Sequence, residues 1–185
     1  MGIVTHSSRR LVLVGLLGVI LLAGCGGGSS SVKPSVYVKS MCTALGNWKN
    51  TIQSAGVALQ SSGAANASRP VAKADYQRFV GSLVTATQRA ASSLHSAGTP
   101  AVSDGKQLAD RLAHAFDTAT NRLTQAESQA KSISTDSTTS FQLGASSVTS
   151  EIKSALEAIA AVAPGKSAQL RQAAAKDPTC RALQS

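Results

Sequence analysis

Aromatic residues are scarce in this chain: its 185 residues include one tryptophan, two tyrosines and three phenylalanines. Sandwiches and barrels rely on β-branched and aromatic side chains along their strands, so this scarcity argues against an all-β fold. So few isolated rings also cannot form the stacking platforms that bind single-stranded nucleic acid or sugars. Alanine-rich chains instead pack helices closely through small side chains, and we expect an all-α protein.

The motifs of the common enzyme classes are also missing. The chain has no G-x-S-x-G elbow, no phosphate-binding P-loop and no glycine pattern for a dinucleotide. Glu151 and Glu157 are six residues apart and do not share a helix face, so paired acid–base catalysis is not expected. We therefore predict that the protein is not an enzyme and needs no cofactor.

Candidate metal ligands are few. Asp110, His114 and Asp117 share one face of a predicted helix, which is the arrangement of part of a metal site. No second histidine or carboxylate cluster completes it, and no Glu-x-x-His repeat of the di-iron bundles occurs. We interpret the three residues as a solvated face and expect no metal.

The longest apolar run is too short to cross a bilayer. Leu11–Leu22 holds twelve residues, about 18 Å as a helix, against a hydrocarbon core of about 30 Å. It follows Arg9 and Arg10 and ends in Leu22-Ala23-Gly24-Cys25. A basic start, a short apolar run and small residues before a cleavage point are typical of a secretory signal.

The cysteine at the cleavage point changes this interpretation. The pattern resembles a bacterial lipobox, in which the sulfur of Cys25 receives a diacylglycerol and residues 1–24 are removed. An ordinary cleaved signal is the alternative. The segment around Arg9 and Arg10 partly resembles a twin-arginine signal, so export by that route or by the general secretory route stays open.

Cysteine usage agrees with an extracytoplasmic protein. If Cys25 carries lipid, Cys42 and Cys180 remain as an even pair in an oxidising compartment. A disulfide between them would close a loop of 138 residues, nearly the whole domain. A redox role would need a C-x-x-C spacing or a nearby histidine, so we predict a structural disulfide.

Helical periodicity dominates the rest of the chain. Residues 25–33 are predicted to be a lipidated cysteine and a flexible tether, which includes the sequence GGGSSS at Gly26–Ser31. A single domain is expected over 34–185. Apolar residues then recur every three or four positions along a first helix, at Val38, Met41, Leu45, Trp48, Ile52, Ala55 and Leu59. Three further stripes follow, interrupted near Pro70, at Gly98-Thr99-Pro100 and near Ser132–Ser140, and a short segment lies over 167–176.

Four helices with short turns predict an antiparallel up-down bundle, followed by a short C-terminal helical segment. An even number of helices places both ends of the bundle together. This placement brings Cys180 back toward Cys42, so helix count and cysteine spacing support each other.

The rings suggest one candidate pocket. Trp48 lies on the first stripe, where it would anchor the core or form one wall of an apolar pocket with Phe79 and Phe116. Tyr37 and Tyr76 lie off the stripes, so we expect their rings to be exposed.

Positive charge is unevenly distributed. After removal of residues 1–24, the chain has 16 basic and 9 acidic residues. The first helix with its lead-in, the second helix and the tail from Lys166 onward are each net +3, whereas the third helix is neutral and the fourth, together with the turn before it, is net −2. A basic side of this kind suits anionic lipid or an acidic wall polymer. Nucleic acid is not an expected partner outside the cell.

A family resemblance follows from these residues. The lipobox, the stretch Cys42-Thr43-Ala44-Leu45-Gly46-Asn47-Trp48 and the C-terminal Asp177-Pro178-Thr179-Cys180 resemble small secreted lipoproteins of actinobacteria. The resemblance implies a paired disulfide and a place at the outer face of the cell membrane. It implies no activity, and no catalytic residue transfers.

Two functions fit these expectations. The first is a monomeric, lipid-anchored binding or scaffolding module whose basic face contacts anionic lipid, wall polymer or an envelope protein. The second is a carrier of a small apolar ligand in a pocket near Trp48, Phe79 and Phe116. A carrier needs an enclosed apolar cavity of about a few hundred cubic ångströms, whereas a scaffold needs an exposed patch or a basic face.

Cys25→Ser should release the protein from membranes into the medium. Each buried methylene of a lipid anchor contributes about 0.8 kcal/mol, so losing both acyl chains removes stable anchoring. Fractionation followed by immunoblotting measures the change, with Ser29→Ala in the tether as the control that stays on the membrane. Membrane retention of the Cys25 variant would contradict the lipobox.

Overall fold

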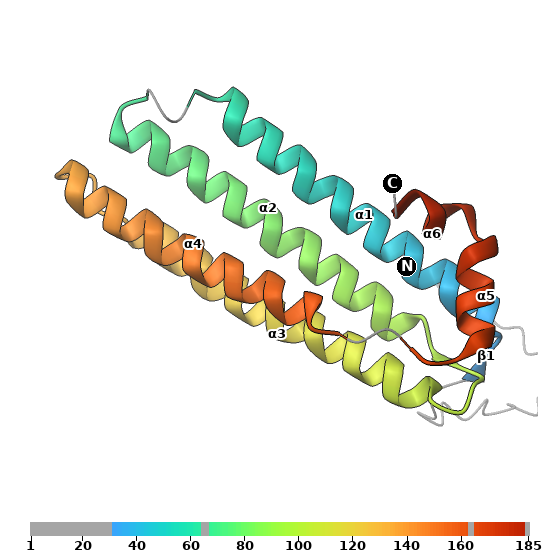
Figure 1. Ribbon diagram of the computed structural model, residues 1–185. Coiled ribbons are helices and arrows are strands. Elements are labelled where there is room, and N and C mark those ends of the chain that lie inside the picture. The colour runs from blue at the N-terminus through green and yellow to red at the C-terminus, as the bar shows by residue number, and fades with distance from the viewer. Residues whose placement is uncertain (1–30, 64–66, 163–164, 184–185) are drawn as a thin grey trace, which may run out of the picture.

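The computed structural model describes residues 31–63, 67–162 and 165–183. Within these residues the chain forms six helices and two strands of two residues each (Figure 1). The predicted all-α class is therefore confirmed in its coarse form. The predicted signal peptide, Cys25 and the first part of the tether lie outside the described residues.

Four long helices form the body of the molecule. They are α1 (Pro34–Ser61), α2 (Arg69–Ser96), α3 (Gly105–Ser132) and α4 (Thr138–Ala160). Figure 1 shows them side by side, each running opposite to the one before it. The apolar stripes of the sequence explain this packing, because each stripe must be buried against a neighbouring helix.

Local residues explain where these helices begin and end. Proline occupies the first turn of α1 and of α2, where its missing N–H has no helical partner to lose. The hydroxyl of Ser137 accepts a hydrogen bond from the backbone N–H of Ser140 and caps α4. Gly98, with φ of 77°, takes the left-handed conformation that stops α2.

The core runs along α3. Five of its side chains are fully buried or nearly so, with Phe116, Ala119, Leu123, Ala126 and Ala130 all at 0% exposure. Three of these five are alanine, and small side chains let the neighbouring helices approach closely. The buried clusters around them draw on α1, α2 and α4. Helix α3 therefore contributes side chains to each buried cluster of the described residues.

The fourth helix is shorter than the first three. It ends at Ala160, and the next described helix is α5 (Ala168–Lys176). A second short helix, α6 (Pro178–Leu183), follows directly. Asp177 separates the two, because its Oδ1 accepts hydrogen bonds from the backbone N–H groups of Thr179 and Cys180 and caps α6.

A small parallel sheet closes the same end of the molecule. β1 (Ser31–Val32) pairs with β2 (Thr99–Pro100), and the N–H of Ala101 donates to the carbonyl of Val32 over 2.8 Å. The sequence predicts a flexible tether up to residue 33, and for these two residues that prediction is wrong. The turn after α2 offers backbone partners that a Gly/Ser composition does not reveal.

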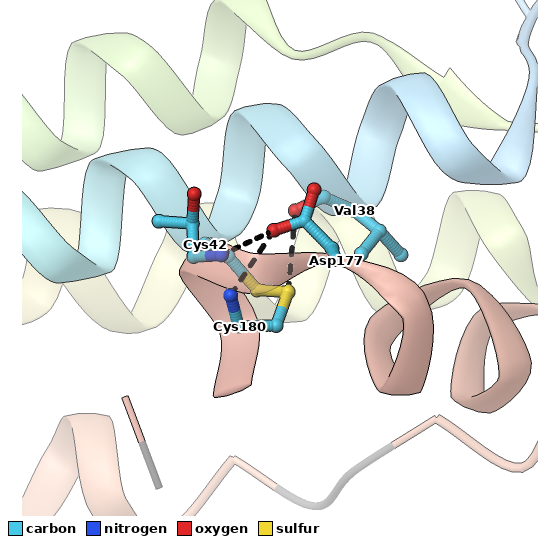
Figure 2. Close-up of a disulfide and its surroundings, with 5 residues drawn as sticks. Val38, Cys42, Asp177 and Cys180 are labelled. Atoms are coloured by element: carbon cyan, nitrogen blue, oxygen red, sulfur yellow. Dashed lines mark hydrogen bonds between the residues drawn. A yellow bond between two sulfur atoms is a disulfide. The ribbon is translucent and has the colours of Figure 1, made fainter. Parts of the chain in front are cut away.

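The C-terminal tail is bonded to the first helix. Cys42 on α1 and Cys180 on α6 form a disulfide with a Cα–Cα distance of 5.1 Å (Figure 2), as the cysteine count predicts. Both residues are buried, and Cys180 Sγ lies 3.9 Å from the carbonyl oxygen of Val38. The bond holds α5 and α6 against the start of α1.

Replacing both Cys42 and Cys180 by serine should lower the free energy of unfolding by about 2–5 kcal/mol, because a crosslink over 138 residues strongly restricts the unfolded chain. Denaturant unfolding of the two forms measures the loss, and non-reducing peptide mass spectrometry checks the pairing in the parent. Free thiols at both positions in the parent protein would contradict the fold of the tail.

Candidate functional site

An apolar cavity of about 330 Å³, partly open to solvent and not enclosed, lies at the end of the molecule that carries α5. Ten of the twelve described residues that line it are apolar or glycine, and the two others are Tyr37 and Arg171. These described lining residues are Tyr37, Val38, Met41, Leu45, Leu108, Leu112, Ile159, Val162, Gly165, Leu170, Arg171 and Ala174. The volume lies near the lower end of the range of small-molecule sites, about 300–1,000 Å³.

Each wall of the cavity comes from a different part of the chain. The first half of α1 and the beginning of α3 supply two walls, and Ile159 at the end of α4 with Val162 just after it supplies the third. Helix α5 covers the fourth side through Leu170 and Ala174, which are four residues apart and share a helix face. The cavity therefore depends on the position of α5, which the disulfide fixes.

The segment before α5 is held in place by α3. Asp104, at the start of α3, makes no cap for that helix; its Oδ2 accepts a hydrogen bond from the backbone N–H of Lys166 over 3.2 Å. At Gly165 a side chain would meet α3, since an added Cβ would lie 2.8 Å from Leu108 Cδ2. Glycine lets the chain run close to α3 at the cavity wall.

Tyr37 is buried, with 1% exposure, and burial raises the pKa of its hydroxyl. Its position off the apolar stripe predicts an exposed ring, and that prediction is wrong. The tail causes the difference, because Leu170 and Cys180 join Tyr37 in one buried cluster. The Tyr37 hydroxyl makes no hydrogen bond to any residue that the structure describes.

Arg171 is the one charged residue among the described residues of the lining. Its Nη1 donates to the carbonyl oxygen of Lys166 over 2.6 Å, and within the described residues it forms no ion pair. A guanidinium has five N–H donors, so most of them stay available. The polar edge of the cavity is thus made of hydrogen-bond donors.

The three rings of the predicted pocket do not surround one cavity. Trp48 and Phe116 meet edge to face with ring centroids 5.5 Å apart, whereas Phe79 stacks on Tyr76 at 6.3 Å in a different cluster. None of Trp48, Phe79 and Phe116 lines the apolar cavity. The predicted position of the pocket is corrected: it lies nearer to the disulfide.

Trp48 is fixed as part of the core. Its Nε1 donates to Thr87 Oγ1 over 3.0 Å, and Thr87 is fully buried. Trp48 also lines a polar groove of about 620 Å³ between α1 and α2. Arg89 and several Asn and Ser residues line that groove, and its described lining contains no carboxylate.

The Asp110, His114 and Asp117 array does not act as one site. Asp110 pairs with Lys106 over 2.6 Å on α3, and Asp117 pairs across helices with His95 over 3.0 Å. His114 lines a cleft of about 730 Å³ together with Arg111 and other residues. In the described parts of the chain, no three His, Cys, Asp or Glu side chains gather where a metal ion could bind.

Ion pairs occupy only part of the molecule. Every ion pair between described residues lies on α2, α3 or α4. Lysines and arginines of α1, α5, α6 and their flanks have no such partner: Lys33, Lys39, Lys49, Lys166, Arg171, Lys176 and Arg181. On α2 and α3, Arg69, Lys73, Arg89 and Arg111 also form no ion pair, but only α1 and the tail have no ion pair at all among their described residues.

The cavity was only partly detectable in the sequence. Val38, Met41 and Leu45 stand on the predicted first stripe, and Leu170 and Ala174 show helical spacing in the tail. Nothing in the sequence indicates that these two segments share a cavity with Leu108 and Leu112.

No helix over residues 31–63, 67–162 and 165–183 combines the length and apolar character that crossing a bilayer requires. Comparisons with protein-family models, curated proteins and solved structures found no match.

Thr87→Val should lower the free energy of unfolding by about 1 kcal/mol, because it removes the hydrogen bond to the Trp48 indole. Trp48 is the single tryptophan, so its fluorescence during denaturant unfolding reports this site directly. Thr124→Val, which removes an exposed hydroxyl on α3, is the matched control and should change stability by less than about 0.5 kcal/mol. Equal effects of the two substitutions would contradict this account of Trp48.

Proposed function

We propose that this chain is a lipid-anchored protein of the cell envelope that holds a small apolar ligand in the cavity beneath α5. The observation that carries the proposal is the cavity itself: about 330 Å³ lined almost entirely by apolar side chains. Of the two functions that fit the sequence, ligand carriage has the stronger support, although its site differs from the three rings first indicated.

Burial of a ligand in this cavity would be driven by the hydrophobic effect. Each methylene moved from water into an apolar site contributes about 0.8 kcal/mol. The lining offers few groups that could react: one buried tyrosine, one arginine and no carboxylate, histidine or cysteine among its described residues. This composition supports binding without chemical conversion.

The fold supports a position of the cavity close to the membrane. β1, the first described segment, lies at the same end of the molecule as α5 (Figure 1). Cys25 precedes β1 by six residues, so a lipid on Cys25 would keep this end near the bilayer. In this arrangement α1 to α4 serve as an up-and-down bundle that carries the cavity at its membrane-proximal end.

The uncompensated cations of α1 and the tail agree with this orientation. An anionic leaflet attracts basic side chains by about 1 kcal/mol each near its surface. These residues also keep the second candidate function open, in which the basic side alone binds anionic lipid or wall polymer and the cavity stays empty.

Ala174→Phe should abolish binding of a neutral apolar probe, because the larger side chain fills the cavity. The probe is N-phenyl-1-naphthylamine, whose fluorescence rises on transfer from water to an apolar site. The protein is residues 25–185 carrying Cys25→Ser, with Cys42 and Cys180 oxidised. We expect saturable binding at one site per chain.

Ala175→Phe is the matched control, since Ala175 is an exposed neighbour on α5 outside the cavity lining, and it should bind the probe like the parent. Absence of saturable binding in the parent would overturn the carrier function. If the parent then still bound anionic vesicles in a salt-sensitive manner, the second candidate would take its place.

A further inference from the structure

We infer that the ligand of this cavity is a single-chain amphiphile with an anionic head, a carboxylate or a phosphate, bound by Arg171 and Tyr37. This inference rests on the proposed function, because it names the chemical class that the apolar cavity would accept. Two observations support it. Arg171 and Tyr37 are the polar side chains of the described lining, and both have hydrogen-bond donors that no described residue accepts.

Arg171, which is exposed to solvent, places a fixed positive charge at the edge of the cavity. A guanidinium stays protonated and can only donate hydrogen bonds. It uses one donor on the carbonyl of Lys166 and pairs with no described carboxylate. A ligand head placed there must accept hydrogen bonds, and a negative head gains a charge-assisted, two-pronged contact.

Tyr37 supplies the second, independent observation. It is 1% exposed and lines the cavity, yet its hydroxyl has no hydrogen-bond partner among the described residues. Its hydroxyl oxygen is not fully buried, so water can reach it, and it is available to donate a hydrogen bond to a ligand. An oxygen of a bound head group can accept that hydrogen bond.

The remaining lining excludes other kinds of ligand. The described lining has no carboxylate to pair with a cationic head, and no amide or serine hydroxyl to recognise a sugar. Its volume of about 330 Å³ is small for a binding site, so it suits one acyl chain rather than the two of a complete phospholipid.

The experiment compares twelve-carbon chains that differ only in their heads. Dodecanoate, dodecyl phosphate, dodecanol and dodecyltrimethylammonium each compete with N-phenyl-1-naphthylamine for the same protein of residues 25–185 carrying Cys25→Ser. We expect the two anions to bind about tenfold or more tighter than the alcohol, and the cation to bind most weakly. The ratio between carboxylate and phosphate tells which head the site prefers.

Two substitutions test the residues. Arg171→Gln should weaken dodecanoate about tenfold or more while changing dodecanol less than about twofold. Arg181→Gln, a basic residue of α6 outside the cavity lining, is its matched control and should leave both affinities unchanged.

Tyr37→Phe separates a ligand contact from a structural role. It removes a hydroxyl that has no described partner, so the melting temperature of the empty protein should stay the same or rise. Dodecanoate binding should nevertheless weaken about threefold or more. A lowered melting temperature with unchanged dodecanoate affinity would contradict the assigned role of Tyr37.

The failures of the two proposals are distinguishable. If the neutral probe and dodecanol bind but the anions bind no better, and Arg171→Gln changes nothing, the anionic head is wrong and the carrier function stands. If no chain and no probe binds the parent, the carrier function itself is wrong.

Discussion

The bond between Cys42 and Cys180 decides where the last sixteen described residues of the chain lie, and the cavity depends on that placement. Without the bond, α5 and α6 would be two short helices with little apolar surface, and helices of nine and six residues are not stable alone in water. Bonded to α1, they bury Tyr37 and supply a wall of the cavity. A single crosslink therefore links the stability of the tail to the existence of the site.

The core outside the cavity is closely packed. Along α3 the buried alanines leave room only for their neighbouring helices, and Phe116 and Leu123 fill the space between them. The cavity lies where this regular packing stops. Helix α4 ends there at Ala160, whereas its antiparallel neighbour α3 extends further at the same end of the molecule, where its first residues lie. Gly165 and Lys166 lie next to the beginning of α3 there, and Lys166 is held by Asp104. The site is thus a consequence of one helix being shorter than its neighbours.

Ion pairs are also unevenly distributed over the molecule. The carboxylates lie mainly on α3 and α4 and pair with some of the cations there and on α2. The described lysines and arginines of α1 and the tail form no ion pair, and neither do Arg69, Lys73 and Arg89 of α2 or Arg111 of α3. Because the tail is bonded to α1, the cations of α1 and the tail share the end of the molecule that carries the cavity. Net charge alone predicts a basic protein, but only the fold gives that charge a position relative to an apolar site.

The sequence by itself determined the helical class, the approximate bounds of the long helices and the pairing of Cys42 with Cys180. These follow from local spacing: apolar residues every three or four positions, prolines and a glycine at helix ends, and an even pair of cysteines. Tertiary structure alone decided that Tyr37 is buried, that Ser31 and Val32 pair with the turn after α2, and that Phe79 stays apart from Trp48 and Phe116. The physical reason is that burial depends on what covers a side chain. Tyr37 is covered by residues more than 130 positions away in the sequence, and no local periodicity carries that information.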